Sequence, residues 1–176
     1  MNELILMQGC PGSGKSRMAE VLRQYYENLE VEAQIYSADR FWYECVGDDK
    51  GRYDFVPELR YRAHQWCQQG VLGAMKIGIP VIIVDNTNTT KKEAVPYRVM
   101  ANLFDYAVHV VRVDPGVEEC IRRQASRPED RRVPEDIIRT MHGRLETLIP
   151  DEPDFLLFNT PWSKLTAPFE DDTNTK

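Results

Sequence analysis

The stretch Gly9-Cys10-Pro11-Gly12-Ser13-Gly14-Lys15-Ser16 decides the fold, because it matches the P-loop pattern G-x-x-x-x-G-K-[ST] in full. An apolar run over residues 3–8 precedes it and predicts a strand, and an amphipathic run over residues 15–30 follows and predicts a helix. In such a turn, backbone N–H groups of the loop and of the helix N-terminus surround phosphate oxygens. We expect Lys15 to reach the β- and γ-phosphates of a nucleotide and the Ser16 hydroxyl to bind Mg²⁺.

Short β-rich runs and longer amphipathic runs alternate along the rest of the chain, a pattern typical of a parallel α/β sheet. The further strands are predicted over residues 32–37, 81–85, 106–113 and 155–158. The further helices are predicted over residues 57–76, 91–104, 117–124 and 134–148. We therefore expect an α/β P-loop NTPase fold in which helices cover both faces of a parallel sheet of about five strands. One domain is expected over residues 1–167, with an insertion over 43–56 and a disordered tail over 168–176.

Composition narrows the classes of protein that remain. With 176 residues, 42% hydrophobic and 28% charged, the chain is typical of a globular protein. Its four cysteines form no CxxC pair, which disfavours zinc knuckles, redox dithiols and a disulfide framework. A net charge of −6 argues against sequence-blind wrapping of nucleic acid, although it leaves room for a local basic groove. No apolar run is long enough to span a membrane and no signal peptide is visible, so we expect a cytoplasmic protein without membrane contact or an obligate protein partner.

Two aspartates follow predicted strands, where open α/β sheets bind their ligands. Asp85 ends the apolar run 81–84, which favours a position near Mg²⁺ or the substrate, the alternative being a turn formed by Asp85 and Asn86. Asp39 follows the second strand and could take a proton from an attacking hydroxyl. The alternative for Asp39 is an N-cap of a helix that starts at Arg40.

Arginines concentrate in residues 122–144, around a charged segment that joins two predicted helices. The seven are Arg122, Arg123, Arg127, Arg131, Arg132, Arg139 and Arg144. Arginines beside a P-loop commonly bind phosphate oxygens, and Arg127 with either Arg131 or Arg132 is the predicted functional set. Arg139 and Arg144 are instead expected to form ion pairs on a helix surface.

Three aromatic residues, Phe41, Trp42 and Tyr43, come directly after Asp39. Aromatic rings beside a catalytic group can stack on a nucleobase. The alternative is that they pack in the core beneath the insertion, and the sequence leaves both interpretations open.

These motifs resemble the bacteriophage polynucleotide 5′-kinase domain in order and spacing over roughly residues 3–148. The resemblance rests on Gly9–Ser16, Asp39, Asp85-Asn86-Thr87-Asn88 and the segment from Arg123 to Pro134. Residues 55–99 also resemble small stand-alone relatives of that kinase. Phage kinases that phosphorylate 5-hydroxymethyluracil in DNA belong to the same broad group.

The resemblance implies an adenylate-kinase-like core with a lid over about 124–133, ATP with Mg²⁺ as the donor, and a hydroxyl of DNA or another polynucleotide as the acceptor. The implied catalytic residues are Lys15, Asp39 and Arg127, with Asp39 as the base. The implied nucleotide-binding residues are Gly9, Cys10, Pro11, Gly12, Ser13, Gly14, Lys15, Ser16, Arg123 and Arg127. The predicted acceptor-binding residues are Asp39, Arg40, Trp42, Asp85 and Asn88, and the predicted Mg²⁺ ligands are Ser16 and Asp85.

The chain departs from this family at one position. The 5′-kinase has an arginine three residues after its catalytic aspartate, where this chain has Trp42. Arg40, Arg60 or Arg62 are candidates to replace it. The tryptophan slightly favours a hydroxymethyl group on a modified pyrimidine over the 5′-hydroxyl of a strand end, since a stacked base would not need that arginine.

Two other functions stay open at this point. A kinase for a small metabolite suits the acidic composition, and the fold alone does not exclude it. A nucleotide-dependent switch is the third hypothesis, but the Asn-Lys-x-Asp element by which GTPases recognise guanine is absent.

Overall fold

A parallel four-stranded sheet forms the centre of the protein in the computed structural model, which describes residues 2–46, 52–146 and 148. The strands are β1 (Asn2–Gln8), β2 (Ala33–Tyr36), β3 (Val81–Val84) and β4 (Tyr106–Arg112), in the spatial order β2-β3-β1-β4. Every neighbouring pair is parallel. This confirms the predicted α/β fold, while the strand expected over 155–158 and the tail over 168–176 lie outside the described residues.

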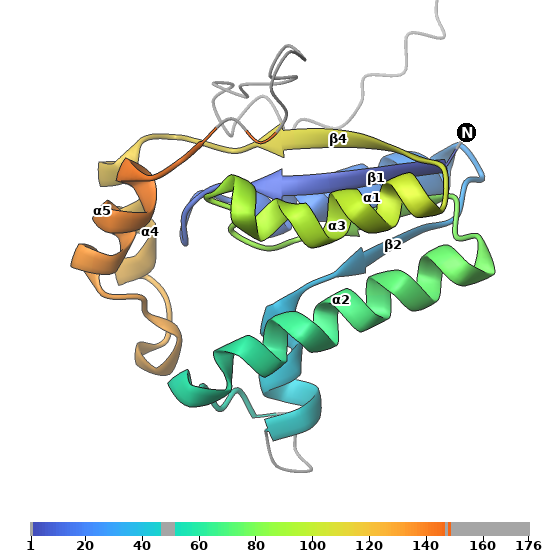
Figure 1. Ribbon diagram of the computed structural model, residues 1–176. Helices are drawn as coiled ribbons and strands as arrows, with labels where there is room; N and C mark the ends of the chain where they lie inside the picture. The colour runs from blue at the N-terminus through green and yellow to red at the C-terminus, as the bar shows by residue number, and fades with distance from the viewer. Residues whose placement is uncertain (1, 47–51, 147, 149–176) are drawn as a thin grey trace, which may run out of the picture.

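In the described part of the chain, five α-helices pack around this sheet (Figure 1). They are α1 (Lys15–Asn28), α2 (Arg60–Ile77), α3 (Lys91–Leu103), α4 (Val117–Ala125) and α5 (Glu135–Gly143). Helices α2 and α3 cover one face of the sheet, α1 covers the other, and α4 and α5 pack together beyond the carboxyl ends of the strands. Among the described residues, no helix combines the length and the apolarity that crossing a bilayer requires.

Alternation along β1 explains why both faces of the sheet are covered. Leu4 and Leu6 join the core cluster formed with α2 and α3, whereas Ile5 and Met7 join the cluster formed with α1. All four side chains are at most 3% exposed. Burying an aliphatic side chain of this size stabilises the fold by about 1.5–3 kcal/mol, so β1 holds the two layers together and carries the loop that follows it.

The chain leaves α5 earlier than the sequence pattern predicts. A helix was expected to reach residue 148, but α5 ends at Gly143 and the backbone returns to the sheet. There Glu146 N donates to Thr89 O at 2.9 Å, and Gln8 Nε2 donates to Glu146 O at 2.7 Å. Gln8 is 1% exposed, and its buried amide requires these partners. The expected helix end was therefore wrong, because a contact with β1 draws the backbone out of the helix.

Short helical turns lie within and on either side of the insertion expected over 43–56. The chain forms a 3₁₀ turn η1 over Ala38–Arg40, a wide π-helical turn η2 over Trp42–Val46, and a 3₁₀ turn η3 over Pro57–Leu59 that leads into α2. Residues 47–51 lie outside the described part of the chain. Turns η1 and η2 follow β2 directly, so they lie at the carboxyl edge of the sheet.

Candidate nucleotide and acceptor site

The P-loop joins β1 to α1 with the turn geometry that phosphate binding requires. Gly12 and Gly14 have φ angles of 86° and 104°, a region that side chains other than glycine rarely adopt. Ser13 N donates to Cys10 O at 3.0 Å within the loop, and Lys15 Nζ donates to the same carbonyl at 3.5 Å. The Lys15 ammonium therefore lies back over the loop, at the start of α1, whose first N–H groups have no partner within the helix.

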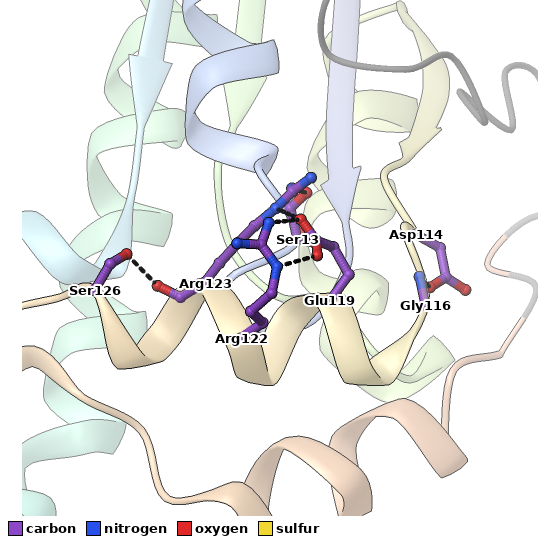
Figure 2. Close-up of polar contacts among 7 residues, drawn as sticks. All are labelled: Ser13, Asp114, Gly116, Glu119, Arg122, Arg123 and Ser126. Atoms are coloured by element: carbon purple, nitrogen blue, oxygen red, sulfur yellow. Dashed lines mark hydrogen bonds and ion pairs between the residues drawn. The ribbon is translucent and has the colours of Figure 1, made fainter.

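Helix α4 packs closely against the P-loop. A Cβ built on Gly12 would lie 2.4 Å from the carbonyl oxygen of Cys120, so only hydrogen fits between the two backbones. Arg123 Nη1 donates to Ser13 O at 2.8 Å while its Nε donates to Glu119 at 2.6 Å, as Figure 2 shows. These contacts give Arg123 a role in holding the loop. Its direct contact with the nucleotide stays a prediction.

Cys10 occupies a P-loop position, but its thiol faces the protein. The side chain is 2% exposed and belongs to a cluster with Cys120 and Ile138. Burial, reinforced by the nearby Cys120 and Asp114, raises the pKa of the Cys10 thiol to about 12. The protonated thiol therefore packs against α4 and α5, which leaves the backbone as the part of Cys10 available to phosphate.

A cleft of about 350 Å³ opens at the carboxyl ends of β2 and β3. It is lined by Ser16, Glu20, Arg23, Ile35, Ser37, Asp39, Arg40, Tyr43 and Asp85. The cleft thus brings together the predicted Mg²⁺ ligands, the predicted base and one of the arginines proposed to replace the missing one.

Asp85 and Ser16 have the chemistry that a hydrated Mg²⁺ requires. Asp85 Oδ1 is buried and has no hydrogen-bond partner among the described residues. Carboxylate and hydroxyl oxygens are the ligands Mg²⁺ prefers, and it usually keeps several waters and binds with substrate phosphates. The described residues contain no cluster of three or more His, Cys, Asp or Glu side chains that would hold a metal without a nucleotide. The two residues therefore fit an ion that arrives with the nucleotide.

The Asp39 carboxylate lies in a site where nearby charges and desolvation both change its pKa. Its side chain opens onto the cleft, yet surrounding protein atoms desolvate it, and this desolvation raises its pKa above the ordinary value. The negative charge of Asp85 acts in the same direction, whereas the positive charges of Lys15 and Arg127 lower the pKa. The fold thereby brings the charges of the P-loop lysine and of Arg127, which belongs to the segment predicted to form a lid, close enough to act on the carboxylate.

The turn that carries Asp39 is held by a buried amide. Asn86 is 6% exposed; its Oδ1 accepts from Ala38 N at 2.8 Å and its Nδ2 donates to the Tyr97 hydroxyl at 3.0 Å. Ser37 Oγ accepts from Asp39 N at 3.2 Å and caps the turn, which leaves the Asp39 carboxylate unused for capping. The positioning role of Asn86 was not predicted, and a polar residue directly after an apolar strand is the sequence signal that could have shown it.

The arginines of the segment predicted to form a lid have different surroundings. The positive charge of Arg127 lowers the pKa of Asp39, and its contact with the transferring phosphate stays a prediction. Arg132 Nε donates to Arg127 O at 2.7 Å, and the Arg131 guanidinium lies over the rings of Tyr43 and Tyr53.

Arg139 and Arg144 lie outside this group. Arg139 pairs with Glu135 and Glu118, which confirms the expected ion pairs on the helix surface. Arg144 pairs instead with Glu93 at 3.8 Å and contacts Thr89 Oγ1 at 3.1 Å.

Two predicted acceptor residues require correction. Trp42 is 2% exposed, and its indole meets the rings of Phe41 and Phe55 edge to face in the core, so it cannot stack on an incoming base. Asn88 is also 2% exposed, and its Nδ2 donates to Met7 O at 2.8 Å, which ties the segment after β3 to β1. Both side chains are committed to packing within the protein.

Of the arginines considered as replacements, Arg40 lies at the cleft. Its side chain is 60% exposed, its Nε lies 3.6 Å from Glu44, and its Nη1 donates to Ile35 O at 3.3 Å. Arg60 and Arg62 are exposed on α2, outside the set of residues that line the cleft. Arg40 is therefore available to contact an acceptor.

Comparison with known proteins identifies the family and the fold. Residues 4–148 match the family model described as an AAA domain. Human NEDD4-binding protein 2 is 34% identical over 105 residues, which make up 60% of this chain and 5% of that protein. The chain therefore spans only a small part of that relative's length.

Two solved structures show the likeness in three dimensions. Mycobacterium tuberculosis APS kinase CysC in complex with AMPPNP and APS aligns with a TM-score of 0.55 and 15% identity, over 71% of this chain and 69% of that chain. A chain of the Pnkp1/Rnl/Hen1 RNA repair complex aligns with a TM-score of 0.58 and 24% identity, over 82% of this chain and 44% of that chain. At these identities the likeness concerns the fold alone. The chain thus belongs to the AAA domain family and has a P-loop kinase-like α/β fold.

Proposed function

We propose that this protein transfers the γ-phosphate of ATP to a hydroxyl group of a polynucleotide, the 5′-hydroxyl of a strand end in first place. The observation that carries the proposal is the position of Asp39, in the cleft beside Asp85 and under the influence of both Lys15 and Arg127. A carboxylate placed between the phosphate-binding loop and an open cleft is suited to accept a proton from an attacking hydroxyl.

The proposed reaction assigns one task to each of these side chains. The acceptor oxygen attacks the γ-phosphorus, the bond to the β–γ bridging oxygen breaks, and ADP leaves while the hydroxyl proton passes to Asp39. Lys15 and Arg127 stabilise the negative charge on the transferring phosphoryl group. Ser16 and Asp85 would hold Mg²⁺, which supplies charge neutralisation on the β- and γ-phosphates when it is bound.

The choice of acceptor follows from which side chains reach the cleft. The buried indole of Trp42 removes the reason for favouring a stacked, modified base. Arg40 instead lies at the cleft next to Asp39, where its guanidinium can contact the phosphodiester that follows a 5′-terminal nucleoside. This supports the 5′-hydroxyl, and a modified base becomes the second polynucleotide acceptor.

A small-molecule acceptor is the second candidate function. The cleft of about 350 Å³ is large enough for a small metabolite, and its basic residues have acidic neighbours, Arg23 with Glu20 and Arg40 with Glu44. The likeness to APS kinase extends to the fold and therefore supports this candidate no more than the first.

Transfer of labelled γ-phosphate to three acceptors in parallel tests the proposal. These are 5′-hydroxyl DNA, 5′-hydroxyl RNA, and 5′-phosphorylated DNA that contains 5-hydroxymethyluracil, each assayed with the natural protein and with Asp39→Asn. Label on the 5′-hydroxyl strands, lost in Asp39→Asn, is the expected result. Label only on the hydroxymethylated DNA would overturn the choice of acceptor. Silence on all three with ATP still bound would favour the metabolite kinase.

A further inference from the structure

Three side chains from distant parts of the sequence meet beside the cleft. Tyr43 belongs to η2, Tyr53 follows it, and Arg131 ends η4 (Glu129–Arg131) in the segment between α4 and α5. The two rings have centroids 5.1 Å apart, and the guanidinium carbon of Arg131 lies 5.2 Å from the centroid of Tyr43 and 5.7 Å from that of Tyr53. These distances are within the range of a cation–π interaction with both rings.

This cluster lies on the acceptor side of the site. Tyr43 lines the same cleft as Asp39. Burial raises the pKa of Tyr53 to about 12, with Asp39 adding to the shift and Arg127 and Arg131 opposing it. The charges of Asp39, Arg127 and Arg131 therefore all act on the Tyr53 hydroxyl. In Figure 1 the segment between α4 and α5 extends toward the turns that follow β2.

Hydrogen bonds within the predicted lid link the residues on either side of Arg131. Arg127 N donates to Gln124 O at 3.0 Å, and Arg132 Nε donates back to Arg127 O at 2.7 Å. A hydrogen bond joins the two ends of this segment, since Val133 N donates to Gln124 Oε1 at 3.2 Å. A displacement of Arg131 from the tyrosines would therefore also displace Arg127.

We infer that the contact of Arg131 with Tyr43 and Tyr53 is a latch that holds the lid over the cleft, and that Arg131 is a positioning residue for Arg127. The inference rests on the proposed phosphate transfer, in which Arg127 acts on the transition state. Arginine suits this latch because its planar guanidinium stacks on aromatic faces more effectively than a lysine ammonium does. Since Tyr43 also lines the acceptor cleft, the latch joins the acceptor side of the site to the lid.

Substitutions at Arg131 test the latch. Arg131→Ala is expected to lower kcat for phosphate transfer by about 2- to 5-fold, the range of one exposed cation–π contact, with little change in the KM for ATP. Arg131→Lys should recover part of the loss. Arg122→Ala is the matched control, because Arg122 is an exposed arginine on α4 whose side chain pairs with Glu119. It should leave both constants unchanged.

Hydrogen exchange supplies a measurement that does not depend on the acceptor. With AMPPNP and Mg²⁺ present, Arg131→Ala and Tyr53→Leu should each speed exchange over residues 126–133, while Tyr53→Phe keeps the ring and should not. The double variant Arg131→Ala with Tyr53→Leu should speed exchange by less than the sum of the two separate effects, because both changes remove the contact between Arg131 and Tyr53 and only Arg131→Ala also removes the contact with Tyr43.

The failure of the latch can be told apart from the failure of the proposed function. Faster lid exchange in Arg131→Ala with no transfer to any polynucleotide would support the latch and refute the proposed acceptor. Unchanged lid exchange and unchanged kcat in Arg131→Ala, in a protein that does phosphorylate polynucleotides, would overturn the latch.

Discussion

One added methyl group tests the close contact between the P-loop and α4. In Gly12→Ala the new Cβ would lie 2.4 Å from Cys120 O, whereas ordinary contacts begin at 3.4 Å. The loop and α4 must therefore separate by about 1 Å, because close-packed backbone atoms cannot overlap. We expect this shift to break at least one hydrogen bond from a loop N–H group to phosphate, which is worth about 1.5–3 kcal/mol for a charged acceptor. ATP affinity should fall by about 10- to 150-fold.

Gly78→Ala is the matched control for the backbone strain of this substitution. Gly78 ends α2 with a φ of 77°, close to the 86° of Gly12, but a Cβ there meets nothing within 4 Å. Both substitutions place alanine in the left-handed region, at about 1–2 kcal/mol of folding free energy. Gly78→Ala should therefore unfold at a lower urea concentration and bind ATP as the natural protein does.

The assay is isothermal titration calorimetry of ATP with Mg²⁺, accompanied by urea unfolding of each variant. Wild-type ATP affinity in Gly12→Ala would refute the argument that α4 fixes the loop. An equal loss of affinity in Gly78→Ala would show that global destabilisation, and not the contact with Cys120, reduces binding.

Three further substitutions test the surroundings of Asp39. Asp39→Asn should lower kcat by about 10²- to 10⁴-fold with ATP affinity retained; calorimetric binding with normal transfer would contradict the assignment. Desolvation raises the pKa of Asp39, so the ionised carboxylate destabilises the fold above that pKa, and this cost is absent below the unfolded pKa of 3.8. Asp39→Asn should therefore unfold at a higher temperature than the natural protein near neutral pH. This difference in melting temperature should shrink as the pH is lowered. Arg127→Ala removes a charge that lowers this pKa, so the acidic limb of the pH–rate profile should move to higher pH; an unmoved limb would place Arg127 too far from the base. Asn86→Ala leaves Ala38 N and the Tyr97 hydroxyl without their partner, which should lower the free energy of unfolding by about 1–3 kcal/mol in urea titrations and reduce kcat through a looser Asp39 turn, and unchanged stability would refute that role.

The local features of this protein were predictable because they depend on neighbours along the chain. The apolar run of β1, the Gly-rich turn and the amphipathic run after it predict a strand, a loop and a helix. The continuous apolar run of β3 predicts a buried strand, and a parallel sheet places Asp85 at the same edge as the P-loop. Ser16 and Asp85 therefore line one cleft, as expected.

Contacts between distant segments were beyond the reach of the sequence pattern. Trp42 has an aromatic ring of the kind that can stack on a nucleobase. The packing of Phe41, Phe55 and α2 around it decides instead that the indole is buried. Arg131 and Arg132 are adjacent arginines that the sequence cannot rank. The direction of each side chain depends on how η4 sits against η2, and that places Arg131 on the tyrosines and Arg132 on the Arg127 carbonyl.

The sequence by itself determined the phosphate-binding loop, the parallel α/β order and the carboxylates at the strand ends. These features depend on strand and helix periodicity and on turn residues, which are set by neighbours a few positions apart in the chain. The tertiary structure alone decided that the charge of Arg127 acts on Asp39, that Asn86 holds the turn of that aspartate, and that α4 packs against Gly12. Each of these contacts joins residues far apart in the sequence. Their partners are chosen by the packing of the whole domain, where burial and steric fit outweigh local preference.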